Sequence, residues 1–235
     1  MDSEISMYLE HARIINQHQW NKITFYEIEL DGQPCVICKS GVGKVLAAMV
    51  CQKLIDLYEP SCIIFTGVAG ALNDKLDIGD VIISKDCIQH DIDGRALGFE
   101  RGTLLFSNQK IFTADKKLVS LALAAKVDGH KLYEGRVLTG DQFFTHSDIE
   151  SHAYLKTEMQ GDCIEMEGAA IAVVASENKL PFVIVRTVSD KADGSAAEDF
   201  NRIHHLVAGN SYAIVKQILS QLKTEPVDLQ CELSE

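Results

Sequence analysis

The amino-acid sequence predicts an α/β fold with a largely parallel or mixed sheet. Short apolar runs rich in β-branched residues alternate along the chain with segments of helical length and pattern, and this alternation is typical of α/β proteins. Of the 235 residues, 46% are hydrophobic and 24% are charged, which fits a globular protein with a sizeable core. We therefore expect one domain over residues 1–222, followed by a polar C-terminal tail at residues 223–235.

The first third of the chain predicts two helices and three strands. The N-terminal helix begins at Met1 and runs to about Glu10, with Ile5, Leu9 and Ile14 near one face. The other expected elements of this part are strands at 23–30 and 34–39, a helix over about 45–57 and a strand at 61–66.

The remainder of the chain continues the alternation. A segment that starts at Pro181 is apolar, β-branched and too short for a typical helix, so it fits a strand that is covered on both faces. The other expected elements are a long strand at 80–93, an irregular stretch at 94–112, a helix over about 116–127, a strand at 132–139, a helix at 168–178 and a final helix over about 198–222.

Charge and composition exclude several classes of partner. The formal net charge is −12, which argues against binding to nucleic acid or to an anionic membrane surface. No apolar window reaches 18 residues and the N-terminus lacks a signal-peptide pattern. The seven cysteines are odd in number and lie mostly in apolar runs, which predicts reduced, buried thiols. Cys35 and Cys38 form a C-x-x-C pattern without a second pair at zinc spacing, so core packing is favoured.

Small or polar clusters follow several of the expected strands. They lie at residues 40–44, 66–70, 140–144 and 186–193. Chemistry in open α/β folds collects where strands end, so ends that point the same way would converge on one pocket. Aromatic rings at 143 and 144 suit stacking on a flat heterocycle, and a carboxylate from Glu165-Met166-Glu167 suits the vicinal hydroxyls of a ribose.

Each cluster also has a purely structural interpretation. Segment 40–44 resembles an anion-binding turn but lacks the Walker and dinucleotide spacings, so a plain tight turn is favoured. Segment 66–70 fits a strand-to-helix corner, and its glycines would let a ligand approach the backbone. The two phenylalanines fit a core, and Ser189 or Asp190 fits a helix N-cap.

The remaining polar clusters indicate neither a metal site nor a nucleophile. Glu165 and Glu167 also fit a solvated helix N-terminus, where the dipole favours negative charge. His90-Asp91-Ile92-Asp93 is interpreted as structural rather than metal-binding. The G-x-S-x-G pattern of a serine nucleophile does not occur. No metal or cofactor is therefore expected.

Six segments together carry more information than each one alone. They are Met1-Asp2-Ser3-Glu4, Lys39-Ser40-Gly41-Val42-Gly43-Lys44-Val45, Thr66-Gly67-Val68-Ala69-Gly70, Gly140-Asp141-Gln142-Phe143, Glu165-Met166-Glu167-Gly168-Ala169 and Val185-Arg186-Thr187-Val188-Ser189-Asp190. In order and spacing they closely resemble the 5′-methylthioadenosine/S-adenosylhomocysteine nucleosidases, within the larger nucleoside phosphorylase family. The resemblance runs from residue 1 to about 222.

The resemblance implies a three-layer αβα domain with a mixed, partly barrel-like central sheet flanked by helices. It also implies a cytoplasmic homodimer that acts in methionine salvage and in removal of methyl-cycle by-products. Family members begin with a short apolar strand ahead of the turn that carries the matching glutamate, whereas this sequence begins within that turn. We expect the natural chain to start several residues upstream of Met1, which leaves open an export signal in that part.

The resemblance further implies hydrolysis of the N-glycosidic bond of thio-substituted adenosines, to adenine and a 5-thioribose. Asp190 matches the general acid that protonates adenine N7, Ser189 matches its supporting hydrogen-bond donor, and Glu4 matches the residue that activates water. Adenine anion is a poor leaving group, so protonation of its ring lowers the barrier. The reaction then needs Asp190 to hold its proton while Glu4 is ionised.

Substrate contacts also follow from the resemblance. Glu167 matches the ligand of the ribose hydroxyls, with Met166 packed under the sugar. Phe143 matches the stacking partner of adenine, and the backbone of Phe144 matches the reader of its edge. The other implied substrate-binding positions are Val42, Val68, Gly70, Arg186 near the ribosyl and water site, and Phe200 as a lid over the 5′-thio group. Val68 stands where many family members carry a small polar residue.

Three alternatives to this activity remain. A purine nucleoside phosphorylase would use phosphate, and Glu4 would repel that anion. Segments Gln89-His90-Asp91 and Gly140-Asp141-Gln142-Phe143 resemble family members that also cleave 6-amino-6-deoxyfutalosine in menaquinone synthesis. An inactive nucleoside-binding protein is the third alternative, and the presence of Glu4, Glu167 and Asp190 argues against it.

Overall fold

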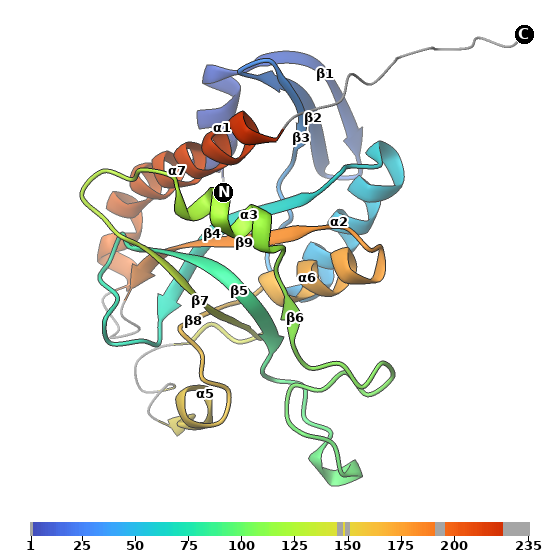
Figure 1. Cartoon of the computed structure of the whole chain (residues 1–235), viewed down its shortest axis with the longest axis vertical. Coiled ribbons are helices and arrows are strands. Elements are labelled where there is room, and N and C mark those ends of the chain that lie inside the picture. The colour runs from blue at the N-terminus through green and yellow to red at the C-terminus, as the bar shows by residue number, and fades with distance from the viewer. Residues whose placement is uncertain (1, 145–147, 149–150, 191–195, 223–235) are drawn as a thin grey trace, which may run out of the picture.

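A closed ring of strands forms the centre of the computed structural model (Figure 1). Around the ring, each of the five strands pairs with two neighbours, in the order β5 (Val81–Gln89), β7 (Leu132–Thr139), β8 (Cys163–Glu165), β4 (Ile63–Ala71) and β9 (Phe182–Asp190). The pairings β5–β7, β7–β8 and β4–β9 are parallel, while β4–β8 and β5–β9 are antiparallel. The short strand β6 (Phe112–Thr113) joins β5 outside the ring. The predicted mixed, barrel-like sheet is thus confirmed.

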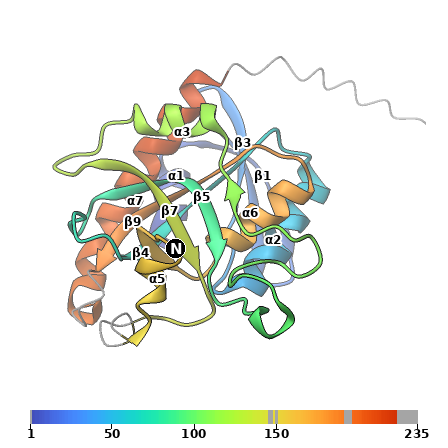
Figure 2. The ribbon, with the colours of Figure 1, turned by 60° about the horizontal axis from the view of Figure 1, so that its bottom comes forward.

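Helices cover the barrel on two sides, which completes the predicted three layers (Figure 2). The structure describes residues 2–144, 148, 151–190 and 196–222, without the side chains of residues 2 and 196–204. One layer contains α2 (Lys44–Tyr58) and α6 (Gly168–Glu177), which pack against each other, and the other contains α7 (Ala196–Gln221), with α1 (Asp2–His11) and α3 (Lys116–Leu123) against it. Among the described residues, no helix has the length and apolarity needed to cross a membrane.

A separate antiparallel sheet lies beyond the barrel and was only partly predicted. It contains β1 (Arg13–Trp20), β2 (Ile23–Leu30) and β3 (Gln33–Ile37). Ile28 and Leu30 on its inner face are buried in one cluster with Tyr8 of α1 and with residues of α7. The sequence analysis placed Ile14 on the N-terminal helix, but α1 ends at His11 and Ile14 belongs to β1, where it is 50% exposed. Because β1 is almost wholly exposed, it carries no apolar alternation that would predict a strand.

Most other predicted elements are confirmed, with different bounds. The strand at 132–139 has the predicted limits, and the helix expected at 45–57 is α2. The irregular stretch at 94–112 contains only the short 3-10 turn η1 (Arg95–Leu97) and the first residue of β6. The small elements β8 and α5 (Tyr154–Thr157) were not predicted. Segment 66–70 was wrongly expected to be a corner after a strand ending at Thr66, since β4 continues to Ala71.

Arg186 occupies the inside of the barrel and determines what its neighbours can be. All residues of β9 are buried, and Arg186 is 1% exposed. Its guanidinium stacks over the Phe65 ring at 4.3 Å. A Cβ at Gly67, its register partner on β4, would lie 2.0 Å from Arg186 Nη1. Gly67 therefore makes room for a protein side chain rather than for a ligand.

A methyl group at position 67 is expected to destabilise the fold. Gly67→Ala should lower the free energy of unfolding by about 1–3 kcal/mol, because Arg186 must move or the strands must separate. Gly209→Ala is the matched control, since a Cβ there meets no heavy atom within 4 Å. In the middle of α7 it should stabilise the protein by about 0.5–1 kcal/mol. Urea unfolding measures both, and a Gly67→Ala protein as stable as the wild type would contradict the packing argument.

Candidate active site

The centre of the site is a buried ion pair between Arg186 and Glu165. Arg186 Nη2 lies 2.5 Å from Glu165 Oε2, and both side chains are 2% exposed. The same carboxylate accepts hydrogen bonds from the backbone amides of Glu167 and Gly168, at 2.9 and 2.7 Å, and from the hydroxyl of Thr139. Glu165 therefore lies at the start of α6 and accepts from its first amides, but it is buried rather than solvated as the structural interpretation expected, and it also pairs with the guanidinium.

Glu167 has a more exposed carboxylate than Glu165, and it joins two segments of the chain. Its Oε1 accepts a hydrogen bond of 2.8 Å from the backbone amide of Gly43, and its Oε2 lies 3.6 Å from Arg186 Nη2. Burial raises the pKa of Glu167, Arg186 opposes that change, and Glu165 adds to it. The tight turn predicted at residues 40–44 thus does bind an anion, but the anion is a carboxylate of the protein itself.

Glu4 reaches the barrel from α1 and is held by two hydroxyl groups. It is 4% exposed, and its Oε1 accepts hydrogen bonds of 2.8 Å from Thr66 Oγ1 on β4 and from Ser211 Oγ on α7. Its negative charge acts on Arg186 and helps to raise the pKa of that guanidinium. The sequence analysis did not find Ser211, because no local pattern marks a contact between residues 207 positions apart.

Ser189 and Asp190 form the last two positions of β9. Both are buried, and Ser189 Oγ donates to Asp190 Oδ2 at 2.8 Å and lies 3.4 Å from the carbonyl oxygen of Ala69. Gly70 is the register partner of Asp190 on one side of β4 and of Ile164 on the other. The strand registers therefore bring Asp190 and the Glu165 end of β8 to the same part of the barrel. The helix that Asp190 was alternatively expected to cap would start within residues 191–195, outside the described residues.

The segment after β7 presents one aromatic ring to solvent and buries the next. Phe143 is 64% exposed, whereas Phe144 is 7% exposed and meets His90 and His152 edge-on, with centroids 5.5 and 5.2 Å apart. A Cβ at Gly140 would lie 2.3 Å from His90 Nε2. Because His90 and Phe144 fix the base of this segment, the core interpretation is confirmed for the Phe144 side chain. The role predicted for its backbone, and stacking of a base on Phe143, remain predictions.

The other predicted site residues differ in how far the structure describes them. Val68, Gly70 and Met166 are half-buried, and Val42 is 70% exposed on the turn that leads into α2. The side chain of Phe200 lies outside the described residues. In the part of the chain that the structure describes, no group of three or more His, Cys, Asp or Glu residues is arranged to hold a metal ion.

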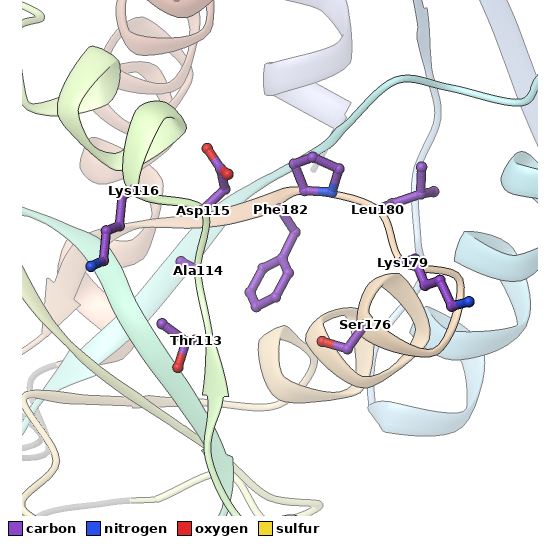
Figure 3. Close-up of a pocket in the computed structure, with 9 residues that line it drawn as sticks. Thr113, Ala114, Asp115, Lys116, Ser176, Lys179, Leu180 and Phe182 are labelled. Atoms are coloured by element: carbon purple, nitrogen blue, oxygen red, sulfur yellow. The ribbon is translucent and has the colours of Figure 1, made fainter.

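A hollow among the described residues lies away from these side chains. It measures about 490 Å³ and surrounds Phe182, at the opposite end of β9 from Asp190 (Figure 3). Lys116 and Lys179 line it from either side, with Asp115 between α3 and the strand. The Asp115 carboxylate already has a structural role, because it caps α3 by accepting a hydrogen bond from the amide of Leu118. No predicted site residue lines this hollow, so the site is identified by its side chains rather than by its depth.

Comparison with known proteins assigns the family. A family profile described as the phosphorylase superfamily matches residues 1–220. The 5′-methylthioadenosine/S-adenosylhomocysteine nucleosidase of Tolumonas auensis is 35% identical over 228 residues, which are 94% of this chain and 96% of that protein. This chain belongs to the same nucleosidase family.

Solved structures agree with the nucleosidase family. The Neisseria meningitidis nucleosidase of that name, in complex with methylthio-immucillin-A, is 33% identical with a TM-score of 0.87, over 94% of this chain and 96% of that chain. A futalosine hydrolase of Helicobacter pylori is 26% identical with a TM-score of 0.85, over 94% of this chain and 95% of that chain. The family resemblance inferred from six short segments is thus confirmed.

The segments that carried the nucleosidase resemblance meet in space. Segment 39–45 contacts segment 165–169 through Gly43 and Glu167, and segment 165–169 contacts segment 185–190 through Glu165 and Arg186. Glu4 joins them through Thr66. Their spacing along the chain therefore reflects one three-dimensional cluster.

His90 is expected to make the nucleosidase less stable in mild acid. Burial lowers the pKa of His90 to about 4, so this imidazole is neutral in the folded protein and protonates more readily in the unfolded chain. Its contribution to stability is present above pH 6.5 and is lost as the pH falls towards 4. Between pH 7.5 and pH 5 the loss should be about 2 kcal/mol.

Urea unfolding of His90→Gln and wild-type protein at several pH values tests this expectation. The His90→Gln variant should have a lower free energy of unfolding than the wild type at pH 7.5. That free energy should fall less than the wild-type value as the pH is lowered. His18→Gln, at an exposed position of β1, should follow the wild-type pH dependence. Parallel curves for His90→Gln and the wild type would refute the role given to His90.

Proposed function

We propose that this chain hydrolyses the N-glycosidic bond of 5′-methylthioadenosine and S-adenosylhomocysteine, releasing adenine and the corresponding 5-thioribose. The observation that carries the proposal is the cluster of Glu4, Glu165 and Glu167 around the guanidinium of Arg186, with Ser189-Asp190 at the end of the same strand, β9. Relatives that share this family are named for that activity.

Asp190 is the proposed general acid at adenine N7. Its hydrogen bond from Ser189 fixes the orientation of the carboxyl group, and its burial keeps bulk water away from that group. Transfer of this proton to the base as the glycosidic bond breaks converts an anionic leaving group into neutral adenine. General acid catalysis of this kind contributes about 10²–10⁴-fold to a rate.

Glu4 and Glu167 act on the sugar side. Bond cleavage leaves positive charge on the ribosyl ring, and three carboxylates with one guanidinium give this region an excess of negative charge that stabilises it. Glu167 binds the ribose hydroxyls, while Glu4 takes a proton from the attacking water. Two hydroxyl groups on Glu4 Oε1 hold its carboxylate in one orientation, which is the preorganisation that such a base needs.

The same charges disfavour a phosphorylase. A phosphate nucleophile would have to approach Glu4, which repels it. The cation beside Glu4 is Arg186, and it is already engaged by Glu165 at 2.5 Å and Glu167 at 3.6 Å. Water carries no charge and meets no such barrier, so hydrolysis fits this site better than phosphorolysis.

A second substrate deserves comparison because of one structural neighbour. The Helicobacter pylori futalosine hydrolase shares the fold over 94% of this chain. The similarity of this hydrolase supports 6-amino-6-deoxyfutalosine as the alternative substrate. That nucleoside differs from methylthioadenosine only beyond the ribose 5′ carbon. The acid, the water side and the ribose contacts would serve both substrates.

We also propose that the chain works as a cytoplasmic homodimer in methionine salvage and methyl-cycle by-product removal. All six described cysteines are free thiols, which fits a reducing compartment. Several large apolar side chains are exposed, and exposed apolar surface often marks a protein–protein contact. They lie at the start of α2 and in the stretch before β6: Val42, Val45, Leu46, Met49, Leu97, Leu105, Phe106 and Ile111.

Adenine release from methylthioadenosine in phosphate-free buffer tests the activity. The wild type should turn over, and Asp190→Asn should lose at least a hundredfold in kcat while still binding the nucleoside. Asp128→Asn, at an exposed position, is the matched control and should not change kcat. Strict dependence on phosphate would establish a phosphorylase, binding without release would establish a binding protein, and faster cleavage of aminodeoxyfutalosine would favour the alternative substrate.

Sedimentation velocity tests the assembly. Val45→Asp introduces a charge at a position that is 78% exposed on α2, and it should shift the protein towards monomer because a buried unpaired charge opposes association. Ile14→Asp, at 50% exposure on β1, should leave the sedimentation coefficient unchanged. A wild type that sediments as a monomer at all concentrations would contradict the dimer.

A further inference from the structure

Lys44 lies between two carboxylates that the proposed mechanism does not use. Its Nζ is 2.7 and 2.9 Å from the two carboxylate oxygens of Asp91 and 3.3 Å from Asp141 Oδ2. The Lys44 side chain is 15% exposed, so most of its length is covered. Asp91 follows β5, Asp141 follows β7, and Lys44 is the first residue of α2. The ammonium group of Lys44 therefore links the start of α2 to the segments that follow β5 and β7.

Backbone hydrogen bonds reinforce the triangle formed by the side chains of Lys44, Asp91 and Asp141. Asp91 Oδ2 accepts a hydrogen bond of 2.9 Å from the amide of Asp141, and Asp141 Oδ1 accepts a longer one of 3.4 Å from the amide of Lys44. Partial burial would raise the pKa of Asp91, but hydrogen bonds from Lys44 and from the Asp141 amide lower it. The ammonium group of Lys44 thus lies between two carboxyl groups that would otherwise face each other without a cation.

Each corner of the triangle leads directly to a residue of the proposed site. Gly43, next to Lys44, donates its amide to Glu167 on the ribose side. Asp141 stands two positions before Phe143 on the base side. Asp91 follows His90, which packs against Phe144. The triangle therefore spans the distance between the carboxylate assigned to the sugar and the ring assigned to adenine.

We propose that Lys44 is a positioning residue that fixes the adenine-stacking segment 140–144 relative to the turn 40–43, which holds the ribose-binding Glu167. The proposal rests on the proposed function, because that function assigns the base to Phe143 and the sugar to Glu167. Lys44 itself does not touch the reacting atoms. By holding both loops it keeps the base stacked before and during bond cleavage, so its contribution appears equally in substrate and transition-state binding.

A kinetic comparison of Lys44→Met, Lys44→Arg and Lys53→Met tests the proposal. Lys44→Met should raise KM for methylthioadenosine by about tenfold with kcat within threefold of the wild type, the pattern of lost uniform binding. Lys44→Arg keeps the charge and should stay within about threefold of the wild-type KM. Lys53→Met, on the same helix but beside Trp20, should change neither constant.

Equilibrium titration with adenine separates this proposal from the proposed function. Lys44→Met should weaken adenine binding by about tenfold, with Lys44→Arg and Lys53→Met near the wild type. If the wild type binds adenine but cleaves no methylthioadenosine, the proposed function fails and the titration still decides the role of Lys44. Absence of adenine binding by the wild type would overturn the positioning role, while adenine release from methylthioadenosine tests the proposed function separately.

Asp91→Asn provides a second variant in case Lys44→Met does not fold. It removes the principal charge partner of Lys44 but retains an oxygen that can accept from the Asp141 amide. It should raise KM and weaken adenine binding in the same direction, by about threefold or more. Unchanged KM and adenine affinity in a folded Lys44→Met or Asp91→Asn protein would overturn the positioning role, as would a fall in kcat at constant KM.

Discussion

The ion pair between Arg186 and Glu165 is the interaction on which both the barrel and the site depend. A buried pair of this kind gives little net stability compared with an apolar pair of equal size, but loss of one partner costs about 3–5 kcal/mol. The pair is therefore better explained by how it positions neighbouring residues than by the stability that it adds. The pair fixes Glu165 at the start of α6, places the guanidinium 3.6 Å from Glu167 and requires glycine at position 67.

The charges of the site follow from how each carboxylate is held. Glu165 is saturated by amides, a hydroxyl and a guanidinium, so it serves as a fixed counter-charge. Glu4 accepts hydrogen bonds from two hydroxyl groups on one oxygen, whereas Glu167 accepts one from the amide of Gly43 and lies 3.6 Å from the guanidinium. The carboxylates thus differ in their surroundings, and such differences let neighbouring acids adopt different roles.

The sequence predicted the parts of this protein whose information is local. The strand at 132–139 and the buried strand from 181 were evident because apolar β-branched runs are bounded by polar residues. Strand β1 was missed because its side chains face solvent, and β8 because three residues become a strand only by pairing with β4 and β7. Motif order indicated Glu4, Glu167 and Asp190 as site residues, and their roles stay predictions. Ser211 and the Lys44 triangle were not found, since their contacts join segments that no short pattern connects.

Closure of the ring has a consequence for how the protein acquires activity. The β5–β9 pairing joins Val81 to Thr187 and completes the barrel only when segments about a hundred residues apart have come together, and such non-local pairing makes folding slow. Arg186 lies on the strand that closes the ring, so its charge leaves water in the same event that aligns Glu165 and Glu167. A partly folded chain therefore holds no partial site, and recovery of activity during refolding should report ring closure itself.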